Sequence, residues 1–476
     1  MATVNDSAPT VESPQLICKG RYVFPPGLRF DLLFYSFSKF FKPGNPIPFF
    51  QHLQRYGRAA HYRVFGHDVV LFNHPSDIRE ILIGKAASFG KDRTQRRIKI
   101  VLGEGLITSD GETHKRARRI AAPAFHRQRI HAYADQISEL AAAVSSQWEP
   151  GESLDIAAEM MRLALQIVAR TLFDTEVTTE IREVNDQMNV IMDLYNYLIA
   201  LPRAEALLDT PLPGMKRFRT AKARLDQVVD GMIAARQREP AARLAERGDL
   251  LSMLIAARDE EQGDVEDGPG AAFSPEELRD QVLTLFLAGF ETVANALAWS
   301  WLLLGQNPEA EAKLHRELDD VLTGRLPTLE DLPRLEYTPM ALAESMRLYP
   351  PVWTMARESL EEVSIGPYRL PKGTMTLFSQ YIVQRDPQWF PDPTAFRPER
   401  HTPEAKAARP RFCYFPFGGG GRQCIGESFA WMEATLAIAT IAQKWRLEIL
   451  PGQQIEVQPK ITLRPKYGIK AKAVQR

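Results

Sequence analysis

The chain has 476 residues, of which 45% are hydrophobic and 25% are charged, with 59 basic and 59 acidic side chains. This neutral balance gives no electrostatic case for nucleic acid or an anionic membrane as a partner. The three cysteines are too few for a disulfide framework, so the composition fits a reducing cytoplasm.

The N-terminal part of the chain predicts short elements. Residues 1–14 are polar and predict a disordered tail. The apolar stretch at 30–41 contains charges and is shorter than the roughly twenty residues of a membrane span. Alternating apolar residues at 62–72 predict a β-hairpin, and a proline opens a short helix at 75–82. A basic helix is predicted at 111–122.

The middle of the chain is predicted to be helical. Helical patterns fill residues 130–258, interrupted by prolines, and an acidic glycine-rich loop follows at 263–270. Ser274 and Glu277 form a capping box at the start of a helix that meets no breaker except one glycine until residue 305. The apolar part of this helix carries an acid and an amide near its centre, which predicts a buried core helix rather than a membrane span.

The C-terminal third adds the β part. Helices are predicted from Asn307 and over 335–348, short strands over 363–382, and a last helix from Cys424 to about Trp445. The length allows about three domains, but no linker is visible. We therefore expect a mainly α fold with a smaller β part (α+β), in a single domain over residues 15–476.

The centre of the long helix reads Ala288-Gly289-Phe290-Glu291-Thr292. A glycine inside a helix costs about 1 kcal/mol relative to alanine, and an unpaired buried acid is costly, so the segment is a functional candidate. That interpretation needs a groove beside Gly289 for a small ligand, with an acid and an alcohol to deliver protons. The alternative is a kinked helix whose acid is satisfied.

Two residue pairs have plain structural explanations when taken alone. Glu344 and Arg347 lie three apart on one helix face, which by itself indicates a surface ion pair. His114 and Arg118 lie four apart on the basic helix, where a solvated face is the default interpretation.

The stretch from Phe417 to Gly426 places Cys424 after a glycine run, at the start of an apolar helix. N–H groups at a helix start lower the pKa of a cysteine, so the sulfur suits a metal, with haem iron the best candidate. A phosphate loop would need Gly-Lys-Ser/Thr, and a nucleophilic cysteine would need a distant histidine base. A buried structural cysteine at a glycine turn is the remaining alternative.

This stretch resembles the cysteine signature of the cytochrome P450 family, whose fixed positions are matched by Phe417, Gly420, Arg422, Cys424 and Gly426. The residue before the arginine is often proline in the family and is Gly421 here. The resemblance implies the P450 fold, with the helix at about 275–305 lying over haem b and Cys424 as the iron ligand. It also implies that Phe417, Gly420 and Gly426 contact the cofactor.

Further motifs resemble the same family in the same order. The resemblance makes Glu291 and Thr292 the catalytic pair that relays protons, and it implies a structural network that holds the cysteine loop, formed by Glu344, Arg347 and Arg400. It implies haem propionate contacts from His114, Arg118, Arg357 and Arg422, with histidine standing where the family usually has tryptophan. Residues placed near the substrate, each with core packing as the alternative, are Phe286, Ala288, Gly289, Val352, Trp353, Thr354, Met355 and Tyr467.

The function implied by the resemblance is that of a haem-thiolate monooxygenase, a soluble and monomeric bacterial-type member. It would hydroxylate or epoxidise an apolar small molecule such as a fatty acid, terpenoid or steroid, using O2. Two electrons would come from a separate ferredoxin or flavodoxin and its reductase, docking on a basic face near Lys115, Arg116, Arg119, Arg127 and Arg129. A peroxide-driven peroxygenase and a non-enzymatic haem gas sensor are the alternatives. The Glu291–Thr292 pair disfavours the first, and the lack of a visible output domain disfavours the second.

Overall fold

The structure is a computed structural model of the chain. It describes most of the chain, with a few single positions between 186 and 247 besides the ranges 15–31, 44–126, 130–174, 210–240, 249–257 and 272–476. The predicted tail at 1–14, most of the apolar stretch at 30–41 and the acidic loop at 263–270 lie outside the described residues.

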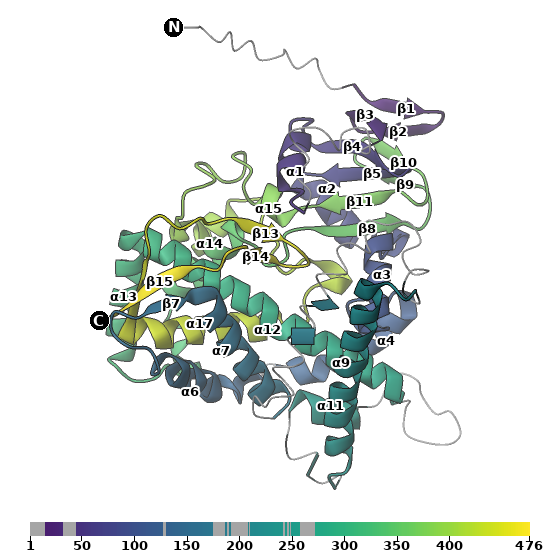
Figure 1. The fold of residues 1–476 in the computed structure, drawn as a ribbon. Coiled ribbons are helices and arrows are strands. Elements are labelled where there is room, and N and C mark those ends of the chain that lie inside the picture. The colour runs from purple at the N-terminus through teal and green to yellow at the C-terminus, as the bar shows by residue number, and fades with distance from the viewer. Residues whose placement is uncertain are drawn as a thin grey trace, which may run out of the picture.

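The largest sheet combines strands from both ends of the chain (Figure 1). The predicted hairpin is confirmed as antiparallel strands β4 (Ala59–Val64) and β5 (His67–Phe72). Strand β5 then pairs in parallel with β11 (Met375–Phe378), a partner more than three hundred residues away in sequence. The remaining strands of this sheet are β3 (Gly27–Asp31), β8 (Met355–Ser359) and β6 (Phe89–Gly90).

Smaller sheets complete the β part. One sheet joins the N-terminal strands to those of the predicted 363–382 region, in the order β1 (Ile17–Lys19), β2 (Tyr22–Phe24), β10 (Tyr368–Leu370) and β9 (Val363–Ile365). A three-stranded sheet contains β12 (Trp445–Ile449), β15 (Lys470–Gln475) and β7 (Ser153–Asp155). A two-stranded hairpin is formed by β13 (Val457–Pro459) and β14 (Leu463–Pro465).

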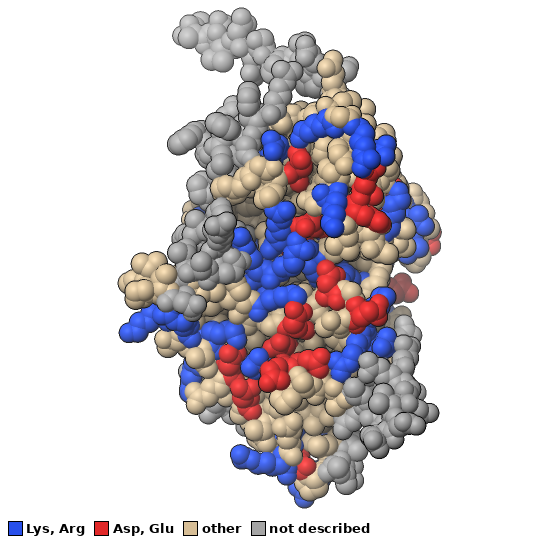
Figure 2. Space-filling model, turned by 90° about the vertical axis from the view of Figure 1, so that its right-hand side faces the viewer, with Lys and Arg blue, Asp and Glu red and all other residues tan. Residues whose placement is uncertain are grey.

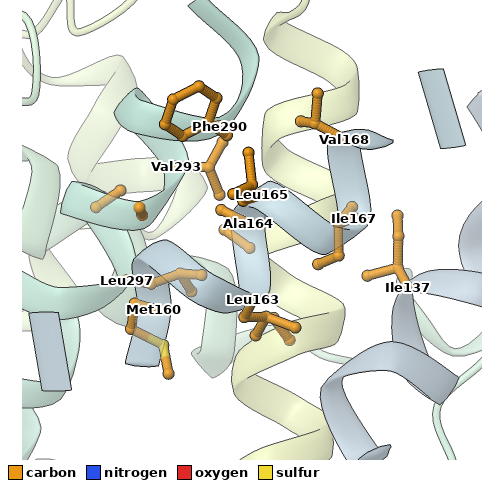
Figure 3. Close-up of a cluster of buried hydrophobic side chains, with 14 of the residues drawn as sticks. Ile137, Met160, Leu163, Ala164, Leu165, Ile167, Val168, Phe290, Val293 and Leu297 are labelled. Carbon is orange, nitrogen blue, oxygen red and sulfur yellow. The ribbon is translucent and has the colours of Figure 1, made fainter. Parts of the chain in front are cut away.

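The long helix α12 (Pro275–Gln306) has 32 residues and runs about 48 Å through the helical part of the molecule (Figure 1). Its predicted capping box is present, because Ser274 Oγ accepts the Glu277 N–H at 3.1 Å while the Glu277 carboxylate accepts the Ser274 N–H at 2.8 Å. Helix α7 (Ile156–Leu172) packs along it, and α6 (Ala134–Ser145) and α17 (Glu427–Lys444) complete the core. Figure 3 shows side chains of α6, α7 and α12 in one buried cluster.

Shorter elements cover this core and connect it to the sheets. The α-helices are α1 (Ile47–Gln54), α2 (Pro75–Arg79), α3 (Arg93–Leu102), α4 (Gly111–Ala121), α9 (Pro213–Gln237), α11 (Leu250–Ala256), α13 (Pro308–Leu322), α14 (Tyr337–Leu348), α15 (Gln380–Val383) and α16 (Pro403–Ala407). The π- and 3₁₀-turns are η2 (Glu80–Gly84), η3 (Ala86–Ser88), η4 (Ala122–Phe125), η6 (Leu329–Asp331), η7 (Pro398–His401) and η8 (Gly420–Arg422). The prediction of a mainly α fold with a smaller β part is confirmed.

Helix α12 is also the one helix among the described residues that is long and apolar enough to cross a membrane. In its most apolar window 78% of the residues are buried inside the protein, which accounts for its apolar composition. It is the core helix that the acid and amide at its centre predicted.

Candidate active site

The centre of α12 retains accessible surface although the helix around it is buried. Between Leu278 and Leu304 every residue is buried except Arg279 and four central positions, Ala288, Gly289, Glu291 and Thr292. Because buried residues flank these four on both sides, we infer that their exposed surface faces an internal space rather than bulk solvent. The structure thus brings the predicted proton-relay pair to one enclosed region.

The two polar side chains of this region are already paired. Thr292 Oγ1 donates to the Ala288 carbonyl of the preceding turn at 2.7 Å. Glu291 Oε1 lies 2.8 Å from both Nε and Nη2 of Arg464 and accepts a hydrogen bond from Thr462 Oγ1. The sequence argument treated Glu291 as an unpaired buried charge, and this premise is wrong. The partners come from β14 and the turn before it, more than 170 residues away in sequence.

Gly289 has a packing role that the sequence argument did not anticipate. A Cβ atom at this position would lie 3.1 Å from Cγ2 of Val168 on α7, closer than ordinary van der Waals contact. The glycine therefore allows α7 and α12 to approach each other closely at this position. Figure 3 shows Val168 in the cluster that these two helices share.

The cysteine loop is a tight turn built on its own backbone. Cys424 N–H donates to the Phe417 carbonyl at 3.0 Å, and Gln423 N–H donates to the Gly420 carbonyl at 3.0 Å. Gly420 has φ of +70°, and a Cβ there would lie 2.1 Å from the Leu82 carbonyl oxygen of η2. No other residue fits this position without moving the backbone, so the loop requires a glycine there.

The thiol of Cys424 combines accessible surface with a desolvated environment. Cys424 has exposed surface, yet burial by the surrounding protein raises the pKa of its thiol to about 11. Both observations hold if the exposed surface faces an enclosed space. A hydrogen bond with the backbone of Gly426 at the start of α17 does lower this pKa, but desolvation outweighs it in the polypeptide alone.

A cluster of buried cations lies near the loop. The pKa of Lys91 is lowered to about 7 and that of Arg357 to about 10. Burial is the larger cause for both residues, and the charge of neighbouring arginines is the next. The same causes, with Lys91 among the neighbours, lower the pKa of His114 to about 4. The acidic groups that oppose these shifts are Asp92 and Asp110. The cluster carries excess positive charge and suits a ligand that brings carboxylates.

Two arginines join this cluster to the loop. Arg422 donates to the Ser109 carbonyl at 3.0 Å and pairs with Asp110. Arg118 donates to the Gln423 carbonyl at 2.8 Å and so holds the backbone beside Cys424. The structure therefore brings together the four residues predicted at haem propionates and adds Lys91. Nothing in the local sequence separates Lys91 from an ordinary surface lysine.

The chemistry of this donor set fits haem. Among the described residues no group of three or more His, Cys, Asp or Glu side chains could hold a metal ion. A metal at Cys424 would therefore need most of its ligands from a cofactor. Haem supplies four nitrogens to the iron and two propionates to the cations, so one cysteine and a basic cluster are what it requires of the protein.

The predicted structural network has a fully buried centre and one partly exposed member, Arg400. Glu344 and Arg347, both with 0% exposed side chains, form two hydrogen bonds of 2.8 Å, and Arg400 Nε lies 3.3 Å from Glu344 Oε1. His401, which the sequence analysis missed, lies with Nε2 3.0 Å from Glu344 Oε2. Burial raises the pKa of Glu344, but hydrogen bonds from Arg347 and His401 outweigh it and leave that pKa below its usual value.

A buried glutamine connects this network to the cysteine loop. Arg347 Nη1 donates to the Gln384 carbonyl at 2.9 Å, and the Gln384 side chain donates to the Met346 carbonyl at 2.9 Å. Gln384 Oε1 in turn accepts the Phe415 N–H at 3.1 Å, two residues before the signature begins. The network therefore reaches the loop through Gln384, which no sequence motif indicated.

The predicted substrate residues divide into two groups. Phe286 packs edge-on against Phe173 and Phe290 at 5.4 Å, and Val352, Thr354 and Met355 are partly exposed. Two others do not fit a pocket. Trp353 is 6% exposed within the core under the large sheet, and its indole donates to the Lys460 carbonyl. Tyr467 is 52% exposed at the surface beneath Lys466, because it lies beyond the end of β14.

The predicted basic face is only partly available for a partner. Lys115 and Arg119 on α4 are exposed, whereas Arg116 pairs with Glu277 at 2.8 Å and donates to the Ala272 carbonyl. Arg127 and Arg129 lie outside the described residues. Figure 2 shows Lys and Arg side chains gathered at the centre of one face, with a band of Asp and Glu below them.

The comparisons with known proteins agree with this geometry. The family model for cytochrome P450 matches residues 25–473, so the chain belongs to the cytochrome P450 family. Members of this family bind haem b through a cysteine thiolate, and the chain is a P450 monooxygenase.

The chain is similar to two Streptomyces enzymes. It is 39% identical to cyclooctatin synthase of Streptomyces melanosporofaciens, over 88% of this chain and 89% of the relative. It is 34% identical to pentalenene oxygenase of Streptomyces avermitilis, over 86% of this chain and 89% of the relative. Among solved structures, retinoic acid-bound cyanobacterial CYP120A1 aligns with a TM-score of 0.80 and 28% identity, covering 95% of this chain and 99% of that one.

Proposed function

We propose that the protein hydroxylates a terpenoid, with residues 15–476 acting as one haem-binding domain. The observation that carries the substrate class is the state of the polar groups at the centre of α12. Glu291 is paired with Arg464, and the Thr292 hydroxyl donates its hydrogen bond to the Ala288 carbonyl. The other accessible surface at the helix centre belongs to Ala288 and Gly289, so the internal space offers a substrate mainly apolar surface. A hydrocarbon ring system meets no uncompensated charge there.

The similarity to cyclooctatin synthase and pentalenene oxygenase supports the same class. Both relatives align over nearly their full length, and both act on terpenoid compounds. Fatty acids and steroids, which the sequence also allowed, have no comparable support among these two relatives.

We assign the residue roles as follows. Cys424 would ligate the haem iron, and Lys91, His114, Arg118, Arg357 and Arg422 would hold the propionates. The haem, when bound, supplies oxygen activation and the two-electron chemistry. The protein supplies the enclosed apolar space, the cations that hold the cofactor and a proton route over Glu291 and Thr292. Glu344, Arg347 and Arg400 keep the loop in place and do not touch the reacting atoms.

Electrons would arrive on the outside of the cysteine loop. Bacterial members of the family use ferredoxin-type partners. A shallow hollow of about 190 Å³ lies over the loop, lined by Ile83, Arg411, Phe412, Tyr414, Phe415, Gly418, Gly419, Gly420 and Gln423. Exposed Lys115 and Arg119 lie on α4, whose Arg118 contacts this loop, so an acidic ferredoxin fits this side of a cytoplasmic monomer.

A ligand-binding titration tests the substrate class. Cyclic terpene alcohols and hydrocarbons should shift the absorption spectrum of the resting haem protein at lower concentration than linear fatty acids of matched carbon number. Equal or tighter binding of the fatty acids would contradict the proposal.

The iron ligand and the proton route are tested separately. Reduced wild-type protein with carbon monoxide should show the band typical of thiolate-bound haem, and C424A should lose it. Retention of that band in C424A would refute the ligand assignment. T292A should divert consumed oxygen into hydrogen peroxide, and unchanged coupling of NAD(P)H to product would refute the relay.

A further inference from the structure

The C-terminal hairpin β13–β14 is attached directly to the functional centre of α12. The Trp299 indole on α12 donates to the Leu463 carbonyl at 2.9 Å, and the Leu463 N–H donates to the Pro351 carbonyl at 2.9 Å. Asn295, one turn after Glu291, donates to the Thr462 hydroxyl at 3.3 Å. The hairpin thus has a fixed position relative to α12, and side chains of the hairpin can hold side chains of α12 in place.

The contacts of Glu291 with this hairpin are asymmetric. Oε1 receives three donors, namely Nε and Nη2 of Arg464 and the hydroxyl of Thr462. Oε2 has no hydrogen-bond partner among the residues that the structure describes. The side chain is 14% exposed, so part of it reaches the accessible space at the helix centre. One oxygen is therefore anchored while the other remains open to water.

We propose that Arg464 is a positioning residue for proton delivery. It clamps Glu291 Oε1, so that Oε2 is held at the edge of the internal space. This inference rests on the proposed role of Glu291 in the relay. Oε2 takes a proton from one water and passes it to the next group on the route. Glu291 is then a carboxylate again, ready for the next turnover. An unclamped glutamate has three rotatable bonds, and a relay atom must be held close to one geometry to act.

The pair is also suited to such a role by its surroundings. Its side chains are 14% and 23% exposed, so it is neither a surface pair nor a sealed core pair. Thr462, at 5% exposure, fixes the carboxylate from a second direction. The proposed effect of Arg464 on the reaction runs through Glu291, the carboxylate that it contacts.

Three variants and a matched control test this inference in the haem-loaded protein. R464Q removes the clamp, R464K retains a positive charge with a single donor group, and E291Q removes the carboxylate. The control is K466Q, which breaks the ion pair of Lys466 with Glu456 at 3.1 Å beyond the same hairpin. For each variant the hydrogen peroxide released per NAD(P)H is measured with a ferredoxin system, and the urea midpoint is measured on resting protein without donor or substrate.

We expect R464Q to raise the peroxide fraction severalfold, as E291Q does, while the double variant raises it no further than the larger single effect. R464K should restore part of the coupling, and K466Q should leave it unchanged. In urea, R464Q and E291Q should lower the midpoint by less together than the sum of their separate effects, which shows that the pair exists in solution. Normal coupling in R464Q beside uncoupled E291Q would overturn the clamp alone. Normal coupling in E291Q would overturn the relay itself, and additive urea shifts would overturn the pairing.

Discussion

Replacing Glu344 with glutamine should be among the most destabilising conservative changes in this protein. Glutamine has nearly the same shape, but it cannot balance the charge of Arg347, whose side chain is 0% exposed. Arg347 would keep its backbone acceptors at Gln384, Pro393 and Ala395 and would lose the carboxylate of Glu344, its one ion-pair partner among the described residues. Removing one partner of a buried ion pair costs about 3–5 kcal/mol, which is more than a hundredfold in the ratio of folded to unfolded protein.

The matched control is E399Q in the neighbouring turn η7. Glu399 pairs with Lys313, but both side chains are nearly half exposed, and such pairs contribute about 0–1 kcal/mol. Urea unfolding of the haem-loaded protein should therefore separate E344Q from E399Q by at least about 2 kcal/mol. Because the network reaches Phe415 through Gln384, E344Q should also weaken the carbon monoxide band of thiolate-bound haem. Similar losses in the two variants would refute the reasoning.

The pH dependence provides a second check on the same residue. The folded-state pKa of Glu344 is below the ordinary value of 4.5. Its stabilisation is therefore fully present above pH 4.5 and is lost as the pH falls through the folded-state pKa. The difference in unfolding free energy between wild type and E344Q should shrink on acidification in that window. A difference that stayed constant would mean that the charge of Glu344 is not the cause.

Three further changes have definite expected outcomes. K91M should weaken haem binding to the apoprotein severalfold, because one propionate partner is lost, while the control K99M on α3 should not. Equal haem affinities of the K91M and K99M apoproteins would contradict the assignment of Lys91. Burial raises the pKa of Glu311 to about 7, so its contribution to stability should fall as the pH rises from 4.5 to 7, and E311Q should lose less stability than wild type over this window in urea unfolding. G289A should destabilise the protein by up to about 2 kcal/mol, because overpacking against Val168 costs about 1–3 kcal/mol and the gain in helix propensity offsets about 1 kcal/mol of it, and V168A should rescue G289A if the overlap is the cause.

The sequence predicted the elements whose signals are local. The capping box at Ser274, the hairpin over 62–72 and the basic helix from Gly111 follow from residues only a few positions apart, and each is present in the structure. The residues proposed to react, Cys424 and Thr292, also come from local signals, because both lie in motifs of fixed spacing. Their local surroundings, a glycine turn and a helix centre, are likewise properties of short segments.

The sequence did not reveal what holds those residues. Gln384, His401 and Arg464 act across gaps of 31, 57 and 173 positions, and no pattern within a single segment indicates such pairings. The misplacement of Tyr467 has a similar origin, because whether a residue near a hairpin faces inward depends on where β14 ends. For Cys424 the helix start that lowers its pKa is visible in the sequence, whereas the packed protein that raises its pKa more strongly is not.

The two glutamate–arginine pairs of the site show how burial changes what one interaction does. Glu344 and Arg347 have no exposed side-chain surface, so separating them would strand a charge in the core, and the pair behaves as a permanent support. Glu291 and Arg464 keep 14% and 23% exposure, so water can replace either partner at a much lower cost. The side of the site near Cys424 is therefore held rigidly. The acid on α12 instead keeps contact with water, as the proposed relay through Glu291 Oε2 requires, while Arg464 and Thr462 hold Oε1 in place.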